Sequence, residues 1–525
     1  MRRILAPCAV LVALSATSCD VTPPRAEPQE APKPSLDLPE SDVSFQWKGT
    51  TVDQGYGGIQ TAMALDLAGH PTVAYFAPAY EALPPPPDIP EIPEEGSGSD
   101  GGSRTLQPME AGGGTLFLPG GTSWSALELP SDLPWAGDGT PIQDALEDFV
   151  PPTFYHLRYA RWDGAYWTVE DVTDVSHARG LSLLHTRDGY PVIAYLDSDH
   201  EIGPEWCAGT FLRVAVRTSA GWQMTTVVPP TQVVDGLCTP GEDCPVCEVN
   251  GLDPVLAQGP SGVVGLAFRR ARYTEGSLAD PDTDQAFVEV QIEGGRVNPG
   301  LPQIVHRAEG AGFFSALQYA TDESGWLVPH VAYLALGEFE TGDAFGAWFA
   351  RYDKTRDQWE KHEIEPWEDW IAGAPLQMII DNRDIYLLMY AVRARHTSVL
   401  LDLTLLHSED GGETWDREYI VSTGRAGGYP SLAMDPSGRL AVSFYQCGGA
   451  FEPTCDPEND GLMFALREDT GWNIDPVLHD DARLDGTFTA LTFSGDTPVL
   501  AARSAMHRGP GGGQVLKVYF GSPPE

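Results

Sequence analysis

Short apolar runs alternate with tight polar turns along this chain, and the pattern repeats about every 50 to 60 residues. The fullest copy, residues 430–445, has an apolar run, a turn containing Asp435 and Gly438, and a second run rich in Val, Ala and Tyr. Asp bonds to nearby backbone N–H groups, and Gly adopts the positive φ that such turns need. Aromatic and β-branched residues suit a half-buried pleated surface. The pattern therefore predicts consecutive short antiparallel strands.

Each repeat predicts four strands. After the second run come a third run, a second tight turn and a fourth run that opens with a tryptophan. This tryptophan recurs in most repeats, at positions 167, 222, 359, 415 and 472. Repeats of this length, without a long helical pattern between the strands, are typical of β-propeller blades. We predict an all-β, seven-bladed propeller of four-stranded antiparallel blades; six or eight blades follow if one weak repeat is misjudged.

The last blade is predicted to take one strand from the other end of the chain. It begins near Asp485, and the chain runs out after its third strand, residues 515–520. Residues 47–52 (WKGTTV) read like the fourth strand at 222–227 (WQMTTV), although no blade precedes them. Ring closure by this N-terminal strand removes the open edges of a linear array.

One turn carries a family resemblance. Ser408, Asp410, Gly412 and Trp415 fit the pattern Ser-x-Asp-x-Gly-x-x-Trp, which resembles the Asp-box of sialidase-like (BNR-repeat) propellers. The segment lies where that family has it, between the third and fourth strands of a blade. These residues are expected to fasten the turn: the carboxylate accepts N–H groups, Gly frees the backbone and Trp packs against the blade. In this family the box lies away from the active site, so the resemblance implies architecture rather than catalysis.

The N-terminal residues predict export and lipid anchoring. Residues 1–18 have two arginines followed by an apolar stretch, as in a secretory signal. The stretch ends Ala16-Thr-Ser18-Cys19, which resembles the lipobox of bacterial lipoproteins, with Cys19 as the acylated residue. The alternative is an ordinary signal with an incidental cysteine. A Pro-rich tether, 19–42, follows and favours the anchored form. We expect a lipoprotein of the bacterial cell envelope, facing the periplasm or the cell surface.

The rest of the chain, 43–525, is predicted to be a single propeller domain with a low-complexity insertion at about 77–153. Six cysteines lie in this domain, an even number that favours disulfides in an exported protein: Cys207, Cys238, Cys244, Cys247, Cys447 and Cys455. Cys447 and Cys455 fall in one loop and are expected to pair, whereas the connectivity of the other four stays open. The Cys-x-x-Cys at 244–247 has neither the second pair that zinc needs nor the strand–helix context of redox motifs.

The charge restricts the partners. A formal net charge of −43 argues against nucleic acid and anionic membranes. Acidic runs at 280–284 and 456–461 have oxygen ligands suited to calcium, but they lack the twelve-residue loop spacing of an EF-hand. We therefore predict no cofactor or metal, with calcium as the alternative.

The connection lengths distinguish the two faces of the ring. Turns between strands one and two, and between strands three and four, are short. The long connections fall on the opposite face, at 77–153, 197–209, 230–253, 270–284, 446–460 and 504–513. We call this the long-loop face. All six domain cysteines lie there, so we expect a disulfide-pinned binding surface on it, because binding residues tend to sit on loops held by a rigid scaffold. The alternative is that long loops are merely tolerated on this face.

An enzyme is the less favoured interpretation. The resemblance implies three substrate-binding arginines, the first in a motif of the first blade, yet before Arg158 the mature chain has arginines only in the tether and the insertion. Arg269, Arg393 and Arg503 follow second strands toward the long-loop face and are candidates for lining a cleft, although each is also explained as a solvated strand end. No His-Glu-x-x-His, Gly-x-Ser-x-Gly or Walker motif occurs.

The recurrent tyrosines share one position in each blade, which indicates packing rather than a nucleophile; they are Tyr75, Tyr195, Tyr333, Tyr390 and Tyr445. The sequence favours a non-catalytic module that recognises a glycan or a protein. The alternative is a sialidase-like glycoside hydrolase with a divergent site, because propellers host many functions.

Overall fold

The structure is a computed structural model of the 525-residue chain. All the residues that it describes belong to one compact unit, 41–525. They are 45–53, 57–79, 154–176, 180–198, 210–229, 245–274, 282–307, 310–335, 346–364, 370–395, 398–422, 425–448, 456–478, 483–506 and 514–523. Within these ranges the chain forms strands and turns, and it offers no helix long and apolar enough to cross a membrane.

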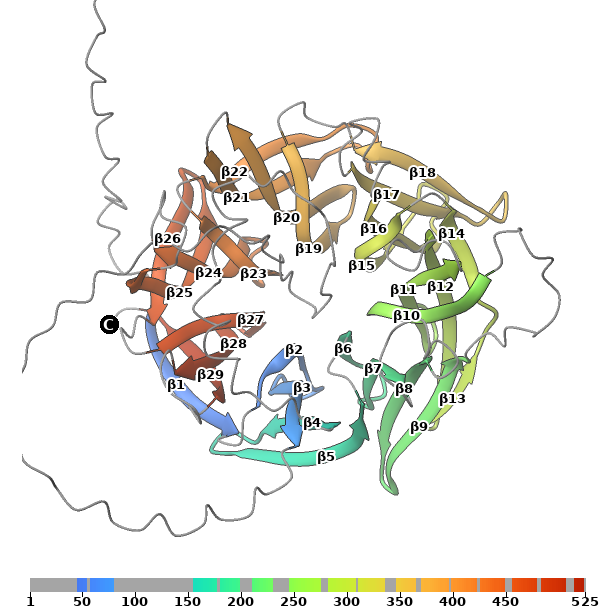
Figure 1. Ribbon diagram of the computed structural model, residues 1–525, viewed down its shortest axis with the longest axis horizontal. Helices are drawn as coiled ribbons and strands as arrows, with labels where there is room; N and C mark the ends of the chain where they lie inside the picture. The colour runs from blue at the N-terminus through green and yellow to red at the C-terminus, as the bar shows by residue number, and fades with distance from the viewer. Residues whose placement is uncertain are drawn as a thin grey trace, which may run out of the picture. The chain divides into compact units, whose positions relative to one another are not determined.

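The strands form seven antiparallel blades arranged in a ring, as predicted (Figure 1). Blade 1 contains β2 (Ile59–Leu65), β3 (Pro71–Ala79), β4 (Phe154–Trp162) and β5 (Trp167–Val175). Blade 2 contains β6 (Leu181–His185), β7 (Pro191–Ser198), β8 (Thr210–Thr218) and β9 (Gly221–Val228). Blade 3 contains β10 (Pro245–Gln258), β11 (Val263–Thr274), β12 (Asp282–Glu293) and β13 (Arg296–Pro299), and β14 (Gln303–Arg307) also pairs with β12.

The remaining blades follow in chain order. Blade 4 contains β15 (Ala311–Thr321), β16 (Leu327–Ala335), β17 (Gly346–Asp353) and β18 (Gln358–Ile364). Blade 5 contains β19 (Trp370–Asp381), β20 (Asp384–Arg395), β21 (Ser398–Ser408) and β22 (Asp416–Val421). Blade 6 contains β23 (Arg425–Met434), β24 (Leu440–Gly448), β25 (Asp456–Glu468) and β26 (Gly471–Leu478). Blade 7 contains β27 (Arg483–Ser494), β28 (Thr497–Met506), β29 (Gln514–Ser522) and, from the start of the chain, β1 (Gln46–Asp53).

The predicted ring closure is confirmed. Strand β1 pairs antiparallel with β29, from Gln46 opposite Ser522 to Thr51 opposite Lys517, so the N-terminal strand completes blade 7. Figure 1 shows β1 as the outermost strand of that blade, next to β5 of blade 1. Two ends of the chain that are more than 450 residues apart in sequence are thus joined by a continuous ladder of backbone hydrogen bonds.

Polar contacts reinforce this junction between blades 7 and 1. Asp53 Oδ2 on β1 accepts a hydrogen bond of 2.7 Å from the Tyr75 hydroxyl on β3 and one of 2.8 Å from Arg158 on β4. The Trp167 indole N–H on β5 donates to Thr50 Oγ1 at 3.0 Å. Burial, together with the negative charge of Asp53, raises the pKa of Tyr75, so its hydroxyl stays protonated and donates. Side chains therefore join the first and last blades where the ring closes.

The same type of contact recurs at other junctions. Trp472 donates its indole N–H to Glu418 of the preceding blade at 2.9 Å, and Trp359 donates to Gln303 at 3.2 Å. The Tyr333 hydroxyl is 2.8 Å from His306 Nδ1 on β14 of the preceding blade. Four of the recurrent tyrosines are buried, at positions 75, 195, 333 and 445. The recurring aromatic residues thus lie where one blade packs on the next.

The hydrophobic core consists of layers between blades rather than one central core. Each of the seven large clusters of buried side chains combines residues from two neighbouring blades. The cluster between blades 7 and 1, for example, contains Val52 and Val518 from blade 7 and Val73 and Ala160 from blade 1. Because each blade is covered on both faces by its neighbours, its stability depends on closure of the ring.

The predicted loops at 230–253, 270–284 and 446–460 were drawn too long, because the strand pairing of β10, β11, β12, β24 and β25 continues into them. The short turns on the other face have a common construction. At the turns between first and second strands, an aspartate accepts backbone N–H groups two and four residues ahead, as Asp66, Asp322 and Asp435 do. Each turn closes with a glycine at positive φ, such as Gly438 at +87°. These turns, and those between third and fourth strands, are short. The connections between second and third strands leave from the opposite edge, which is the long-loop face.

Candidate functional site

Arg269 is a buried structural residue, so its interpretation as a solvated strand end was wrong. It is 4 % exposed. Its guanidinium lies 3.2 Å from Asp253 Oδ2 and 4.0 Å from the ring centroid of Phe313, which belongs to blade 4. A buried arginine needs such partners, because an uncompensated charge in the interior is costly. Arg269 therefore joins blades 3 and 4.

Arg503 lies among aromatic side chains nearer the long-loop face. Its guanidinium carbon is 5.9 Å from the ring centroid of Phe488, and the Phe488 ring is 4.7 Å from that of Tyr429 on blade 6. Burial raises the pKa of both Tyr155 and Tyr429, and the positive charge of Arg503 partly offsets this in each. Gly58 of blade 1 leaves room for the arginine, because a Cβ there would lie 3.3 Å from Arg503 Cβ. We call Tyr155, Tyr429, Phe488 and Arg503 the Arg503 cluster.

Backbone strain occurs in the same region. Tyr429 and Phe488 adopt φ of +51° and +54°, a conformation that costs bulky residues about 1–3 kcal/mol each. Equivalent inner-strand residues of other blades share it, namely Gln60, Asp253 and Phe314. In each case the ladder to the second strand is interrupted by a bulge. Bulges re-aim side chains and are common next to functional sites.

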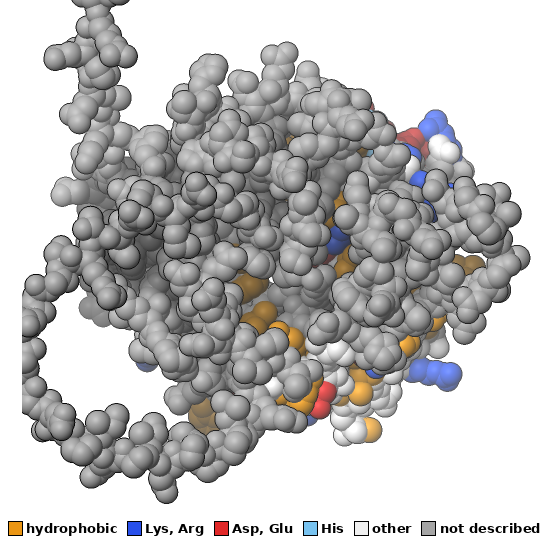
Figure 2. Space-filling model, in the orientation of Figure 1, with side chains coloured by type: hydrophobic (Ala, Val, Ile, Leu, Met, Phe, Trp, Pro, Cys, Tyr) orange, Lys and Arg blue, Asp and Glu red, His pale blue; other side chains and the backbone are white. Residues whose placement is uncertain are grey.

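The middle of the ring combines hydrophobic and basic side chains. Figure 1 shows the seven innermost strands, including β2, β15, β23 and β27, around its centre. In the same orientation, Figure 2 shows hydrophobic side chains and a Lys or Arg side chain toward the middle of the face turned to the viewer. Two of the predicted arginines make contacts with aromatic rings: Arg269 with Phe313 of blade 4, and Arg503 with Phe488 of its own blade 7.

For several other predicted residues the structure does not describe the side chain. Arg393 and Cys447 belong to β20 and β24, and Cys247 belongs to β10, at positions where only the backbone is described. Cys19, the tether, the insertion and the remaining domain cysteines, Cys207, Cys238, Cys244 and Cys455, are not among the described residues. The disulfide pairs and the lipid anchor therefore stay predictions.

Asp284, in one of the acidic runs considered for calcium, is engaged with arginines. It is fully buried, Arg270 donates two hydrogen bonds to its Oδ2, and Arg272 and Arg307 lie 3.6 and 3.9 Å from its Oδ1. Three cations around one carboxylate disfavour a divalent ion at this oxygen pair. The described residues contain no group of three His, Cys, Asp or Glu side chains arranged to hold a metal.

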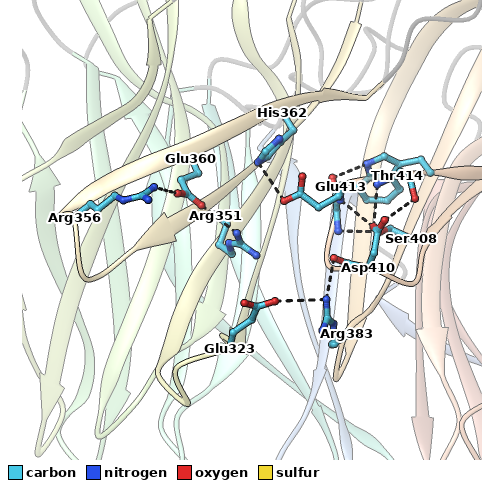
Figure 3. A network of polar contacts seen from close by, with 12 residues as sticks. Glu323, Arg351, Arg356, Glu360, His362, Arg383, Ser408, Asp410, Glu413 and Thr414 are labelled. Atoms are coloured by element: carbon cyan, nitrogen blue, oxygen red, sulfur yellow. Dashed lines mark hydrogen bonds and ion pairs between the residues drawn. The ribbon is translucent and has the colours of Figure 1, made fainter.

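The Asp-box turn is held by its own side chains (Figure 3). Asp410 Oδ1 accepts hydrogen bonds from the backbone N–H groups of Glu413 and Thr414 at 3.0 and 2.9 Å, and from the Ser408 hydroxyl at 2.8 Å. The Ser408 oxygen in turn accepts the Gly412 N–H. Hydrogen bonds from Thr414 and Ser408 hold the pKa of Asp410 well below its usual range. The turn is at the short-turn face, away from the Arg503 cluster.

Contacts also run from the Asp-box to blade 4. Arg383 donates to the Asp410 carbonyl at 3.4 Å and lies 3.6 Å from Glu323, and His362 lies 4.0 Å from Glu413 (Figure 3). The Trp415 ring packs edge-on against Phe349, with centroids 5.7 Å apart. Because exposed ion pairs contribute little, the aromatic packing is the main link between the two blades here.

The prediction of a seven-bladed β-propeller is confirmed by the ring of this chain. No family model and no curated protein matches the chain. Similar solved structures include a protein of unknown function from Dyadobacter fermentans, with 11% identity and a TM-score of 0.43 over 66% of this chain and 94% of that one. Another is the NanB sialidase from Streptococcus pneumoniae, with 11% identity and a TM-score of 0.40 over 91% and 70%. A third is the phage phi92 endosialidase, with 9% identity and a TM-score of 0.39 over 92% and 70%.

Proposed function

We propose that the chain is a recognition module that binds a glycan or a protein at its long-loop face through the Arg503 cluster. The observation that carries the proposal is the position of the Arg503 guanidinium beside the ring of Phe488, which itself packs against the ring of Tyr429. A guanidinium donates hydrogen bonds to ligand oxygens, and aromatic rings pack on the apolar faces of sugars or side chains. In a chain of net charge −43, such a site also provides local positive charge.

Binding without catalysis is favoured over hydrolysis by what the described acids do. Asp253, the one acid among the strained inner-strand residues, is in an ion pair with Arg269. Asp53 is held by Tyr75 and Arg158. Both carboxylates are thus engaged by side chains of the protein itself, whereas a general acid must reach the proton acceptor on a ligand. The alternative, a glycoside hydrolase with a divergent site, predicts turnover of whichever glycan is bound.

A glycan array tests the proposal. We expect the full-length protein to bind one class of glycan selectively, and the Arg503→Gln variant to lose at least about tenfold in affinity, because charged anchor residues dominate binding energy. The matched control is Arg187→Gln, which removes an exposed arginine from the turn between β6 and β7 on the short-turn face. If Arg503→Gln and Arg187→Gln lose affinity equally, the glycan does not bind at the Arg503 cluster. An array without selective binding would exclude a lectin and leave a protein as the ligand, and hydrolysis of the bound glycan would establish the enzyme.

We propose further that Cys19 anchors the protein in the cell envelope, as the residues around it predict. The expected result is that Cys19→Ser moves the protein from the membrane to the soluble fraction on flotation, because each buried CH₂ of an acyl chain contributes about 0.8 kcal/mol to membrane binding. Cys8→Ser, within the leader, is the control and should leave the protein in the membrane fraction. If Cys19→Ser stays in the membrane fraction as Cys8→Ser does, Cys19 is not the acylated residue.

A further inference from the structure

A pocket of about 230 Å³ lies between blades 6 and 7, on the outer strands of the ring and apart from the Arg503 cluster. Its walls come from β1, β26 and β29, and the residues that line it are Trp47, Gly49, Thr50, Thr51, Val477, Lys517 and Tyr519. Two of these side chains are aromatic, one is aliphatic and one carries a positive charge. The pocket is therefore chemically mixed, as small-molecule sites are.

The pocket exists because blade 7 reverses a size pattern that blades 1, 2, 4 and 6 share. Gly49 on the fourth strand lies opposite Tyr519 on the third. In those four blades the third strand has the smaller member of the pair and the fourth strand the larger: Ala160–Val169, Ala215–Met224, Ala350–Lys361 and Ala465–Ile474. The Tyr519 ring fills the space beside Gly49, since a Cβ there would lie 2.8 Å from Tyr519 Cε1. Without a fourth-strand side chain at this position, room remains next to Trp47.

The charge in this pocket is unusual for the protein. Lys517 is one of five lysines in a chain of net charge −43, and it is half-buried. Among the described residues it has no ion pair or hydrogen bond from its side chain, whereas most described arginines pair with Asp or Glu. A partly desolvated ammonium group gains most from an anionic partner, because its attraction to that partner is less screened than at the open surface.

We propose that this pocket binds a small organic carboxylate with an apolar body about the size of one ring. The carboxylate pairs with the Lys517 ammonium group. The body packs against Trp47, Val477 and Tyr519, and Thr51, which also lines the pocket, has a hydroxyl that can donate to a carboxylate oxygen. The volume is below the roughly 300–1,000 Å³ of typical drug-sized sites, so a single ring fits it better than a larger ligand. A ligand with only a charge, or only a ring, would contact only part of the pocket lining.

Titration of the full-length protein with benzoate tests this site, with saturation-transfer NMR to detect contact and calorimetry to measure affinity. We expect benzoate to bind with a dissociation constant of about 1 mM, in the range usual for so small a ligand. Benzamide, which keeps the ring but has no charge, and acetate, which keeps the charge but has no ring, should each bind at least tenfold more weakly. Equal affinity for benzoate and benzamide would overturn the role of Lys517.

Two variants locate the binding. Lys517→Met should weaken benzoate binding at least fivefold and leave benzamide binding unchanged. Lys48→Met, which removes an exposed lysine from the neighbouring strand β1, should change neither. The double variant Gly49→Val, Tyr519→Ala copies the Ala160–Val169 pair of blade 1 and removes an aromatic wall. It should abolish benzoate binding, and because Tyr519 belongs to the buried cluster between blades 6 and 7, binding is measured well below the lowered unfolding midpoint of this variant. Benzoate binding that survives Lys517→Met and the double variant, or is absent from the unmodified protein, refutes the proposal.

Discussion

Replacing Asp53 by alanine is expected to lower the free energy of unfolding by about 2–4 kcal/mol. Its carboxylate is the acceptor for two donors of blade 1, the Tyr75 hydroxyl at 2.7 Å and Arg158 at 2.8 Å, and its side chain is 12% exposed. Without it the fully buried Tyr75 hydroxyl loses its acceptor, and Arg158 loses the more buried of its two carboxylate partners. Urea unfolding followed by circular dichroism measures the change.

The control for this prediction removes the other partner of the same arginine. Asp171 lies 2.9 Å from Arg158 Nε but its side chain is 67% exposed, so Asp171→Ala should cost less than about 1 kcal/mol. A double-mutant cycle with Arg158→Met then separates the two pairs. If Asp53→Ala and Asp171→Ala cost the same, the junction between blades 7 and 1 does not depend on the buried pair. A lower slope with denaturant in Asp53→Ala would indicate that the ring opens before it unfolds.

The architecture was predictable because the information for it is local. Each repeat contains both the alternation of its strands and the residues that form its turns, as the turn at Asp435 and Gly438 shows. The position of β1 was predictable for the same reason: the segment that begins at Trp47 looks like a fourth strand and has no blade before it. Its pairing with β29 then follows, because an unpaired strand and a three-stranded blade each need a partner.

The surroundings of the arginines were not predictable, because they depend on contacts between blades. Arg269 is buried by Phe313 of the next blade and paired with Asp253, which only the bulge in β10 brings to it. The Arg503 cluster likewise combines blades 1, 6 and 7. A sequence signal for the bulges does exist: a glycine two residues before the strained residue, as in Gly58-Ile-Gln60 and Gly486-Thr-Phe488. This repeated glycine would have identified the inner-strand residues that adopt positive φ, but not the side chains that they contact on neighbouring blades.

The role of Gly49 shows a second limit. In sequence it reads as an ordinary strand position, and its effect becomes visible only when it is compared with the equivalent pairs of other blades. The exchange of size between Gly49 and Tyr519 is a property of two strands at opposite ends of the chain. Pattern within one repeat cannot reveal it.

In the Asp-box, replacing Gly412 by alanine is expected to destabilise the protein by about 3 kcal/mol, the sum of two separate costs. Gly412 has φ of +99°, a conformation that strains a residue with a Cβ. The added methyl group would also lie 2.5 Å from Cε1 of the Phe349 ring, so the ring must move and its edge-on packing with Trp415 is disturbed. Thermal and urea unfolding both report the change.

The neighbouring glycine separates the two costs. Gly411 also has positive φ, +79°, but a Cβ there would meet only Arg351 Nη1, at 3.9 Å. Gly411→Ala therefore carries the conformational cost alone, about 1 kcal/mol, and the difference between the variants measures the contact with Phe349. Replacing the Phe349 ring by a smaller side chain, in Phe349→Leu, should make Gly412→Ala less destabilising than it is in the unmodified protein. If Gly411→Ala and Gly412→Ala are equally destabilising in both backgrounds, backbone strain accounts for the glycine at this position of the box, and packing between blades 4 and 5 does not.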